Sequence, residues 1–114
     1  AYSPLARGLL TGKYIGNKIP EGSRLSRDDK IRKIVNENSD LAVKSYCSLA
    51  SKYNIDPVHM SLAFCNERPF MGSVIFGATD ITQLRKILAG INLKLDSEIY
   101  DEIQMLYKKF PLTF

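Results

Sequence analysis

Cysteine and histidine are scarce in this 114-residue chain, which limits the chemistry it can carry. Its two cysteines, Cys47 and Cys65, form no CxxC pair and have no cysteine–histidine spacing typical of a metal site. Each lies in a segment with helical periodicity, so we predict buried, reduced thiols and no bound metal. The single histidine, His59, falls early in an expected helix after Asp56-Pro57, where an exposed or packing role is far more common than proton transfer.

Long apolar runs and one-sided charge are also missing. No run approaches the roughly 18 apolar residues of a membrane span, and the first residues lack the charged-then-apolar pattern of a secretion signal. We therefore expect a cytoplasmic protein with no membrane partner. Sixteen Lys and Arg against 12 Asp and Glu give a formal net charge of +4, spread along the chain, so we expect no nucleic-acid partner.

The hydrophobic pattern predicts four helices and one short strand. The helices are expected from a cap at Ser39 or Asp40 to Asn54, from Asp56 toward Pro69, from Asp80 to Gly90, and from Asp96 to Lys109. Residues 73–76 are β-prone and lie between two glycines, which favours a buried parallel strand. Residues 15–29 are rich in Gly, Pro, Ser and charge, so we predict an exposed, flexible loop there.

Two runs of sequence resemble a known family. The run AYSPLARGLLTGKY, residues 1–14, has no initiator Met and reads as the end of a buried strand. It resembles a segment of the aldo-keto reductases, NADPH-dependent enzymes on a (β/α)8 barrel, in the branch of potassium-channel β subunits and Tas-like reductases. The run VIFGATDITQL, residues 74–84, resembles the strand, turn and helix that hold the adenosine 2′-phosphate in that family.

The resemblance covers nearly the whole chain and implies an α/β fold. Residues 1–114 would be a single partial domain, the C-terminal fragment of a TIM barrel with its last two strands and their helices. A complete barrel needs about 250 residues, so we expect this chain to be mostly helical and to leave the barrel unclosed.

The resemblance also implies a site for NADPH. The Tyr2 ring would pack on the nicotinamide, the loop that follows would lie along the pyrophosphate, and the Gly-Ala turn would hold the adenosine phosphate. The implied cofactor-binding residues are Tyr2, Ser3, Leu5, Arg7, Gly8 and Lys13 in the first run, and Gly77, Thr79, Gln83 and Lys86 in and after the second. A helix N-terminus attracts anions, and a lysine ammonium is a mobile point charge suited to phosphate.

One departure bears on cofactor choice. Many relatives have Asn, which hydrogen-bonds the adenine, where this chain has Ile87. An isoleucine cannot make that bond, so the preference for NADP over NAD stays open.

The resemblance assigns no catalytic residue to this chain, because the family's catalytic Tyr, Lys, Asp and His lie on earlier strands. We expect the cofactor-binding part of an oxidoreductase that reduces a small-molecule aldehyde or ketone. It would be inactive alone, and a complementing N-terminal barrel segment would restore its activity. The alternative is a non-catalytic relic or interaction module that forms a homo-oligomer through its unclosed edges.

Overall fold

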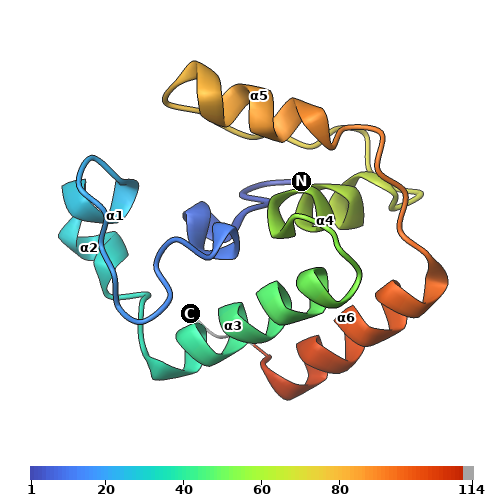
Figure 1. Ribbon diagram of the computed structural model, residues 1–114, viewed down its shortest axis with the longest axis horizontal. Helices are drawn as coiled ribbons and strands as arrows, with labels where there is room; N and C mark the ends of the chain where they lie inside the picture. The colour runs from blue at the N-terminus through green and yellow to red at the C-terminus, as the bar shows by residue number, and fades with distance from the viewer. Residues whose placement is uncertain (112–114) are drawn as a thin grey trace.

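In the computed structural model, which describes residues 1–111, the fold is mostly helical. A short 3-10 helix, η1 (Ala6–Thr11), is followed by α1 (Arg24–Arg27), α2 (Asp29–Arg32), α3 (Glu37–Lys52), α4 (Pro57–Asn66), α5 (Ile81–Ala89) and α6 (Ser97–Lys109). Helix α3 contacts α4, α6 and η1, and α4 contacts both η1 and α5 (Figure 1). The mostly helical character predicted from the sequence is therefore confirmed.

Side-chain hydrogen bonds cap the starts of α3, α4 and α5. Asp56 accepts a hydrogen bond from the Val58 N–H at 2.8 Å, with Pro57 in the first turn, as predicted. Helices α5 and α6 follow Asp80 and Asp96, also as predicted.

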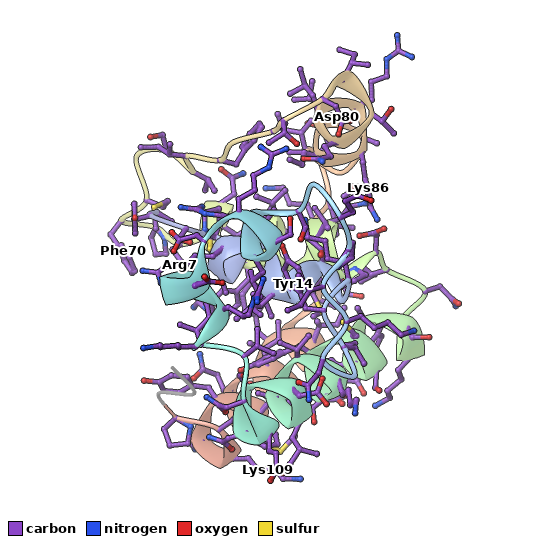
Figure 2. The ribbon with its side chains drawn as sticks, turned by 90° about the vertical axis from the view of Figure 1, so that its left-hand side faces the viewer. Arg7, Tyr14, Phe70, Asp80, Lys86 and Lys109 are labelled. Carbon is purple, nitrogen blue, oxygen red and sulfur yellow. The ribbon has the colours of Figure 1, made fainter. Side chains whose placement is uncertain are left out.

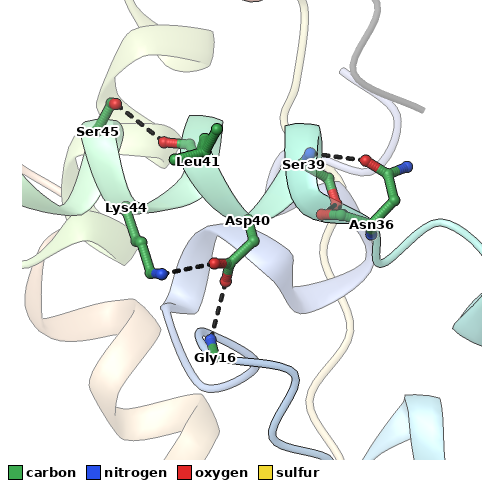
Figure 3. Close-up of polar contacts among 7 residues, drawn as sticks. All are labelled: Gly16, Asn36, Ser39, Asp40, Leu41, Lys44 and Ser45. Carbon is green, nitrogen blue, oxygen red and sulfur yellow. Dashed lines mark hydrogen bonds and ion pairs between the residues drawn. The ribbon is translucent and has the colours of Figure 1, made fainter.

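The predicted start of α3 was wrong. The helix is capped by Asn36, whose side chain accepts from the Ser39 N–H while the Ser39 hydroxyl accepts from the Asn36 N–H, both at 2.9 Å (Figure 3). This reciprocal pair starts the helix earlier than a cap at Ser39 or Asp40 would.

Neither predicted strand is present among the described residues. The amino group of Ala1 donates to the Ser73 carbonyl at 2.5 Å, and the Ala1 carbonyl accepts from the Ile75 N–H at 3.2 Å. Bonds from one residue to both neighbours of Val74 are the pattern of a parallel strand pair. The two segments thus lie side by side, but one paired residue is no ladder, because parallel strands need neighbouring strands and covered faces.

Three buried clusters hold the helices together. The largest lies among α3, α4 and α6 and contains Leu49, Ala50, Met60, Ala63, Leu95, Ile99 and Ile103. A second joins Leu9, Tyr14 and Leu25 to Val43 of α3. The third joins Val58 and Leu62 of α4 to Ile87 of α5, with Leu5 and Val74 packed against it. The opening segment and α5 are therefore both anchored on α4.

The predicted loop at residues 15–29 is partly ordered into helix. It contains α1 and the first residue of α2, and Leu25 is fully buried in the second cluster, so the segment is not simply exposed. Leucine burial outweighs the loop-favouring composition here. The flexibility of this segment stays a prediction.

The remaining sequence expectations concern thiols, metals and membranes. Cys47 and Cys65 are free thiols, half-buried rather than buried, and desolvation raises the pKa of each. Within residues 1–111, no group of three or more His, Cys, Asp or Glu could hold a metal ion. None of the helices in that range is long and apolar enough to cross a membrane.

Two carboxylates tie α6 to the rest of the fold. Glu102 accepts from Lys52 Nζ at 2.6 Å and from the Tyr53 hydroxyl at 2.5 Å. Glu67, at the end of α4, accepts from the Tyr100 hydroxyl at 2.5 Å and from the Leu95 N–H at 3.2 Å. Burial together with the Glu67 charge raises the pKa of Tyr100 to about 12.

We expect Glu67 to make folding stability pH-dependent. Burial alone would raise its pKa, but the bonds from Tyr100 and Leu95 and the charge of Lys94 outweigh burial and lower the pKa below its ordinary 4.5. A carboxylate with a lowered folded pKa stabilises the fold above the unfolded pKa and loses this effect as pH falls through the folded pKa. Glu67→Gln should cost about 1–2 kcal/mol at pH 7 and flatten the stability profile below about pH 4.5.

Urea unfolding followed by circular dichroism from pH 3 to 7 measures this. Glu21→Gln, at an exposed position, is the matched control and should keep the wild-type profile. An unchanged acid slope in Glu67→Gln would contradict the assignment.

Candidate functional site

The opening loop has an unusual concentration of left-handed backbone. Ser3, Ala6, Arg7 and Gly8 all have positive φ, from 47° to 94°. The Gly8 N–H donates to the Leu5 carbonyl at 2.8 Å, and the Arg7 N–H to the Ser3 hydroxyl at 3.1 Å. Non-glycine residues adopt this conformation at an energetic cost, so the surrounding contacts must enforce the loop's shape.

Lys13 folds back over this loop. Its ammonium nitrogen lies 3.7 Å from where a Cβ on Gly8 would stand, and 5.1 Å from the centre of the Tyr14 ring. The Lys13 side chain is exposed, whereas Tyr14 is buried. A cation beside a left-handed glycine backbone is a chemical environment suited to a phosphate or carboxylate. The residues of the opening loop therefore fit an anionic group.

The other predicted residues of the opening run have different surroundings. Tyr2 is 88% exposed, with its ring free to stack. Leu5 packs against the third buried cluster, which favours a structural role. Arg7 is exposed on the face shown in Figure 2.

The start of α5 is capped by its own chain. Asp80 accepts from the Gln83 N–H at 2.9 Å, and the Gln83 side-chain oxygen accepts from the Thr79 N–H and hydroxyl, both at 3.2 Å. Gly77 faces open space. The sequence argument expected unpaired N–H groups to face an anion here, but the Asp80 carboxylate takes one of them and adds a negative charge.

Lys86 is engaged with α4. Its ammonium lies 2.9 Å from Asp56 Oδ2, and its carbonyl lies 2.6 Å from His59 Nε2. Burial would raise the pKa of Asp56, but the Lys86 and Val58 hydrogen bonds outweigh it and lower the pKa. Ile87 is buried against α4, so this position faces the core. His59, expected to be exposed or to pack, is partly buried and packs against Gly90.

Sequence reasoning missed Asp56 as the partner of Lys86, because the two lie on different helices and no spacing rule links them. An open hollow lies beside the Lys13 loop. It is bounded by the end of η1 and the turn between α3 and α4, and is lined in part by Thr11, Lys13, Cys47, Asn54 and Asp56. Lys13 therefore borders the same hollow as Asp56. Figure 2 places Asp80 and Lys86 above Arg7 and Tyr14.

Comparison with known proteins gives consistent matches. The family model described as "Aldo/keto reductase family" matches residues 1–108. Protein tas of Escherichia coli K12 is 33% identical over 110 residues, covering 96% of this chain and 32% of that protein. A probable voltage-gated potassium channel subunit beta of Oryza sativa is 28% identical, covering 96% and 35%. L-glyceraldehyde 3-phosphate reductase of Escherichia coli K12 is 32% identical, covering 81% and 28%. The chain spans about a third of the length of these relatives.

The close approach of α5 to α4 depends on Gly90. A Cβ added there would stand 2.2 Å from the His59 ring, well inside van der Waals contact. Gly90→Ala should therefore destabilise the fold by about 1–3 kcal/mol, as overpacking does. Chemical denaturation measures the change. Gly72→Ala, where an added Cβ meets nothing within 4 Å, is the control and should stay within about 0.5 kcal/mol. Equal stability of the two variants would show that α5 does not pack on His59.

Proposed function

Because the chain belongs to the aldo/keto reductase family, we propose that it is the cofactor-binding C-terminal part of an NADPH-dependent reductase of aldehydes and ketones. The relatives are about three times its length, so the remaining parts of the enzyme would come from another polypeptide or segment. One relative is named as a reductase of an aldehyde phosphate, which supports a small carbonyl compound as the substrate. A cytoplasmic location fits this role.

The Lys13–Gly8 contact carries the proposal. NADPH brings phosphate groups that need cations and backbone donors, and Lys13 places an exposed ammonium beside a left-handed glycine. Tyr2, with its open ring face, would orient the nicotinamide, while Ser3, Leu5 and Arg7 would shape the loop.

The α5 half has to rearrange to take the adenosine phosphate. Gln83 would leave Thr79, and Lys86 would leave Asp56, so that both side chains turn toward the phosphate. These are partly exposed interactions: the Lys86 and Asp56 side chains are 50% and 29% exposed. Such ion pairs contribute about 0–1 kcal/mol, which a phosphate can replace. Asp80 disfavours a second anion, so this half should bind more weakly than the Lys13 half.

The chemistry of reduction would come from elsewhere. NADPH, when bound, supplies the hydride, and this chain's residues only hold and orient it. Four of its carboxylates are occupied by structural hydrogen bonds: Asp56 and Asp80 cap helices, and Glu67 and Glu102 link α6 to the rest of the fold. The complementing N-terminal barrel segment would carry the acid that protonates the carbonyl oxygen.

The test is a fluorescence titration of the 114-residue chain with NADPH. Lys13→Ala should weaken affinity about tenfold or more, because charged hydrogen bonds contribute about 1.5–3 kcal/mol. Gln83→Ala should weaken it about threefold, the size of one neutral hydrogen bond.

Lys18→Ala is the matched control, since Lys18 is an exposed lysine outside the proposed site. It should change affinity by less than about twofold if the effect is local. Equal losses in Lys13→Ala and Lys18→Ala would mean that general charge, not a site, attracts the cofactor. No saturable binding by a folded wild-type chain would mean that the chain alone holds no cofactor site.

Self-association is the second candidate function, favoured by one apolar surface. Ile81, Leu84, Leu88 and Ile91 follow one another by three and four residues, and three of them are exposed: Ile81 by 60%, Leu88 by 45% and Ile91 by 61%. Ile75, 69% exposed, belongs to the segment that leads into α5. Such a row of apolar side chains fits a partner helix, including α5 of a second copy.

Sedimentation equilibrium tests the self-association candidate. If the chain self-associates through α5, Leu88→Glu should shift the dimer to monomer and weaken association at least about tenfold. Leu41→Glu, at an exposed leucine of α3, is the control and should leave association unchanged. A wild-type monomer at high concentration would rule out the self-association candidate.

A further inference from the structure

Helix α3 holds the Lys13 loop at three points along one face. Asp40, Val43 and Cys47 recur at three- and four-residue steps, so they lie on the same side of the helix. Gly16 bonds to Asp40, Tyr14 shares a buried cluster with Val43, and a Cβ on Gly12 would stand 3.1 Å from the Cys47 sulfur. Gly12, Tyr14 and Gly16 therefore all contact α3, and Ile15 packs against the same buried cluster as Val43.

This arrangement decides where Lys13 points. Gly12 and Tyr14 are both turned toward α3, whereas Lys13, between them, is exposed with its ammonium beside Gly8. The orientation of Lys13 thus depends on how firmly its neighbours are attached to α3.

Asp40 makes the only polar attachment recorded between this loop and α3 among the described residues. Its Oδ1 accepts from the Gly16 N–H at 2.9 Å, and its Oδ2 lies 2.6 Å from Lys44 Nζ (Figure 3). Lys44 lies one turn along α3 and pairs with the oxygen that does not bond to the loop. Gly16 has a φ of 74° and Asn17 one of 59°, so the chain reverses at this attachment.

The Asp40 carboxyl group is ionised at neutral pH. The Lys44 hydrogen bond, followed by that of the Gly16 N–H, lowers the pKa of Asp40 below its ordinary value. The carboxylate is therefore ionised and acts as an acceptor on both oxygens.

We propose that Asp40 is a positioning residue for the cofactor phosphate: by accepting the Gly16 N–H, it holds the loop so that Lys13 presents its ammonium beside Gly8. This inference rests on the proposed function of Lys13. Asp40 touches no phosphate itself, because its two oxygens are taken by Gly16 and Lys44.

Three variants of the 114-residue chain test the inference by two readouts, amide hydrogen exchange of Gly16 and NADPH affinity. Asp40→Ala removes the acceptor, and should speed Gly16 exchange and weaken NADPH each about fivefold, the size of one net hydrogen bond. Asp40→Asn keeps an acceptor oxygen and should stay within about twofold of wild type in both. Lys44→Met removes only the ion pair and should behave like Asp40→Asn.

The Asn variant separates positioning from helix stability. Asp40 lies in the first turn of α3, where its charge also favours the helix dipole. Both substitutions of Asp40 lose that charge, so equal effects of Asp40→Ala and Asp40→Asn would overturn the inference.

The two readouts distinguish this inference from the proposed function. Unchanged NADPH affinity in Asp40→Ala, when the wild type binds, overturns the inference and leaves the function intact. Failure of the wild type to bind NADPH contradicts the proposed function. The exchange rate of the Gly16 amide then tests only the attachment of the loop to Asp40. Faster exchange in Asp40→Ala alone supports that attachment, and an unchanged rate overturns it.

Discussion

The packing of α3 on two of its faces is the constraint on which the rest of the structure depends. Leu49 and Ala50 enter the largest buried cluster with α4 and α6, while Val43 enters the cluster that holds the opening loop. Burial of apolar side chains is the dominant favourable term in folding, and α3 is the element that takes part in both of these clusters. The shape of the Lys13 loop is therefore a consequence of core packing.

The opening segment and the segment before α5 lie together for a related reason. Leu5 and Val74 pack on the same α4 cluster, and Ala1 pairs with the residues on either side of Val74. This is the parallel arrangement expected of the last two strands of a barrel, reduced to one residue. A parallel sheet gains its stability from neighbouring strands and from helices on both faces, and this chain supplies helices without enough strands. Apolar side chains of α5 also stay exposed, because no further strand or helix among the described residues covers them.

The two halves of the candidate site, the Lys13 loop and the start of α5, differ in how freely an anion can reach them. Lys13 is exposed and held beside a left-handed glycine, so an anion can approach it without displacing another residue. At α5, Gln83 is bonded to Thr79, Lys86 is paired with Asp56, and Asp80 carries a negative charge at the helix start. Each of these contacts occupies a polar group that a phosphate would need. A phosphate at α5 must compete with them.

The sequence by itself determined the features that depend on neighbours along the chain. Asp56 and Asp80 precede their helices because a side-chain oxygen at the cap reaches N–H groups two or three residues away. The Asn36–Ser39 pair is equally local and was missed only because no Glu or Gln marks it. The two family motifs are also contiguous runs, which is why the family could be identified before the fold.

Only the tertiary structure decided the contacts that join distant segments. Asp40 meets Gly16, 24 residues away, and Lys86 meets Asp56 on another helix. Leu25 is buried within a segment whose composition favours a loop, and residues 73–76 form no strand although their composition favours one. A helix cap depends on residues two or three positions apart, so it can be read from the sequence. These contacts depend instead on which helices pack together and on how many strands are present to pair with one another.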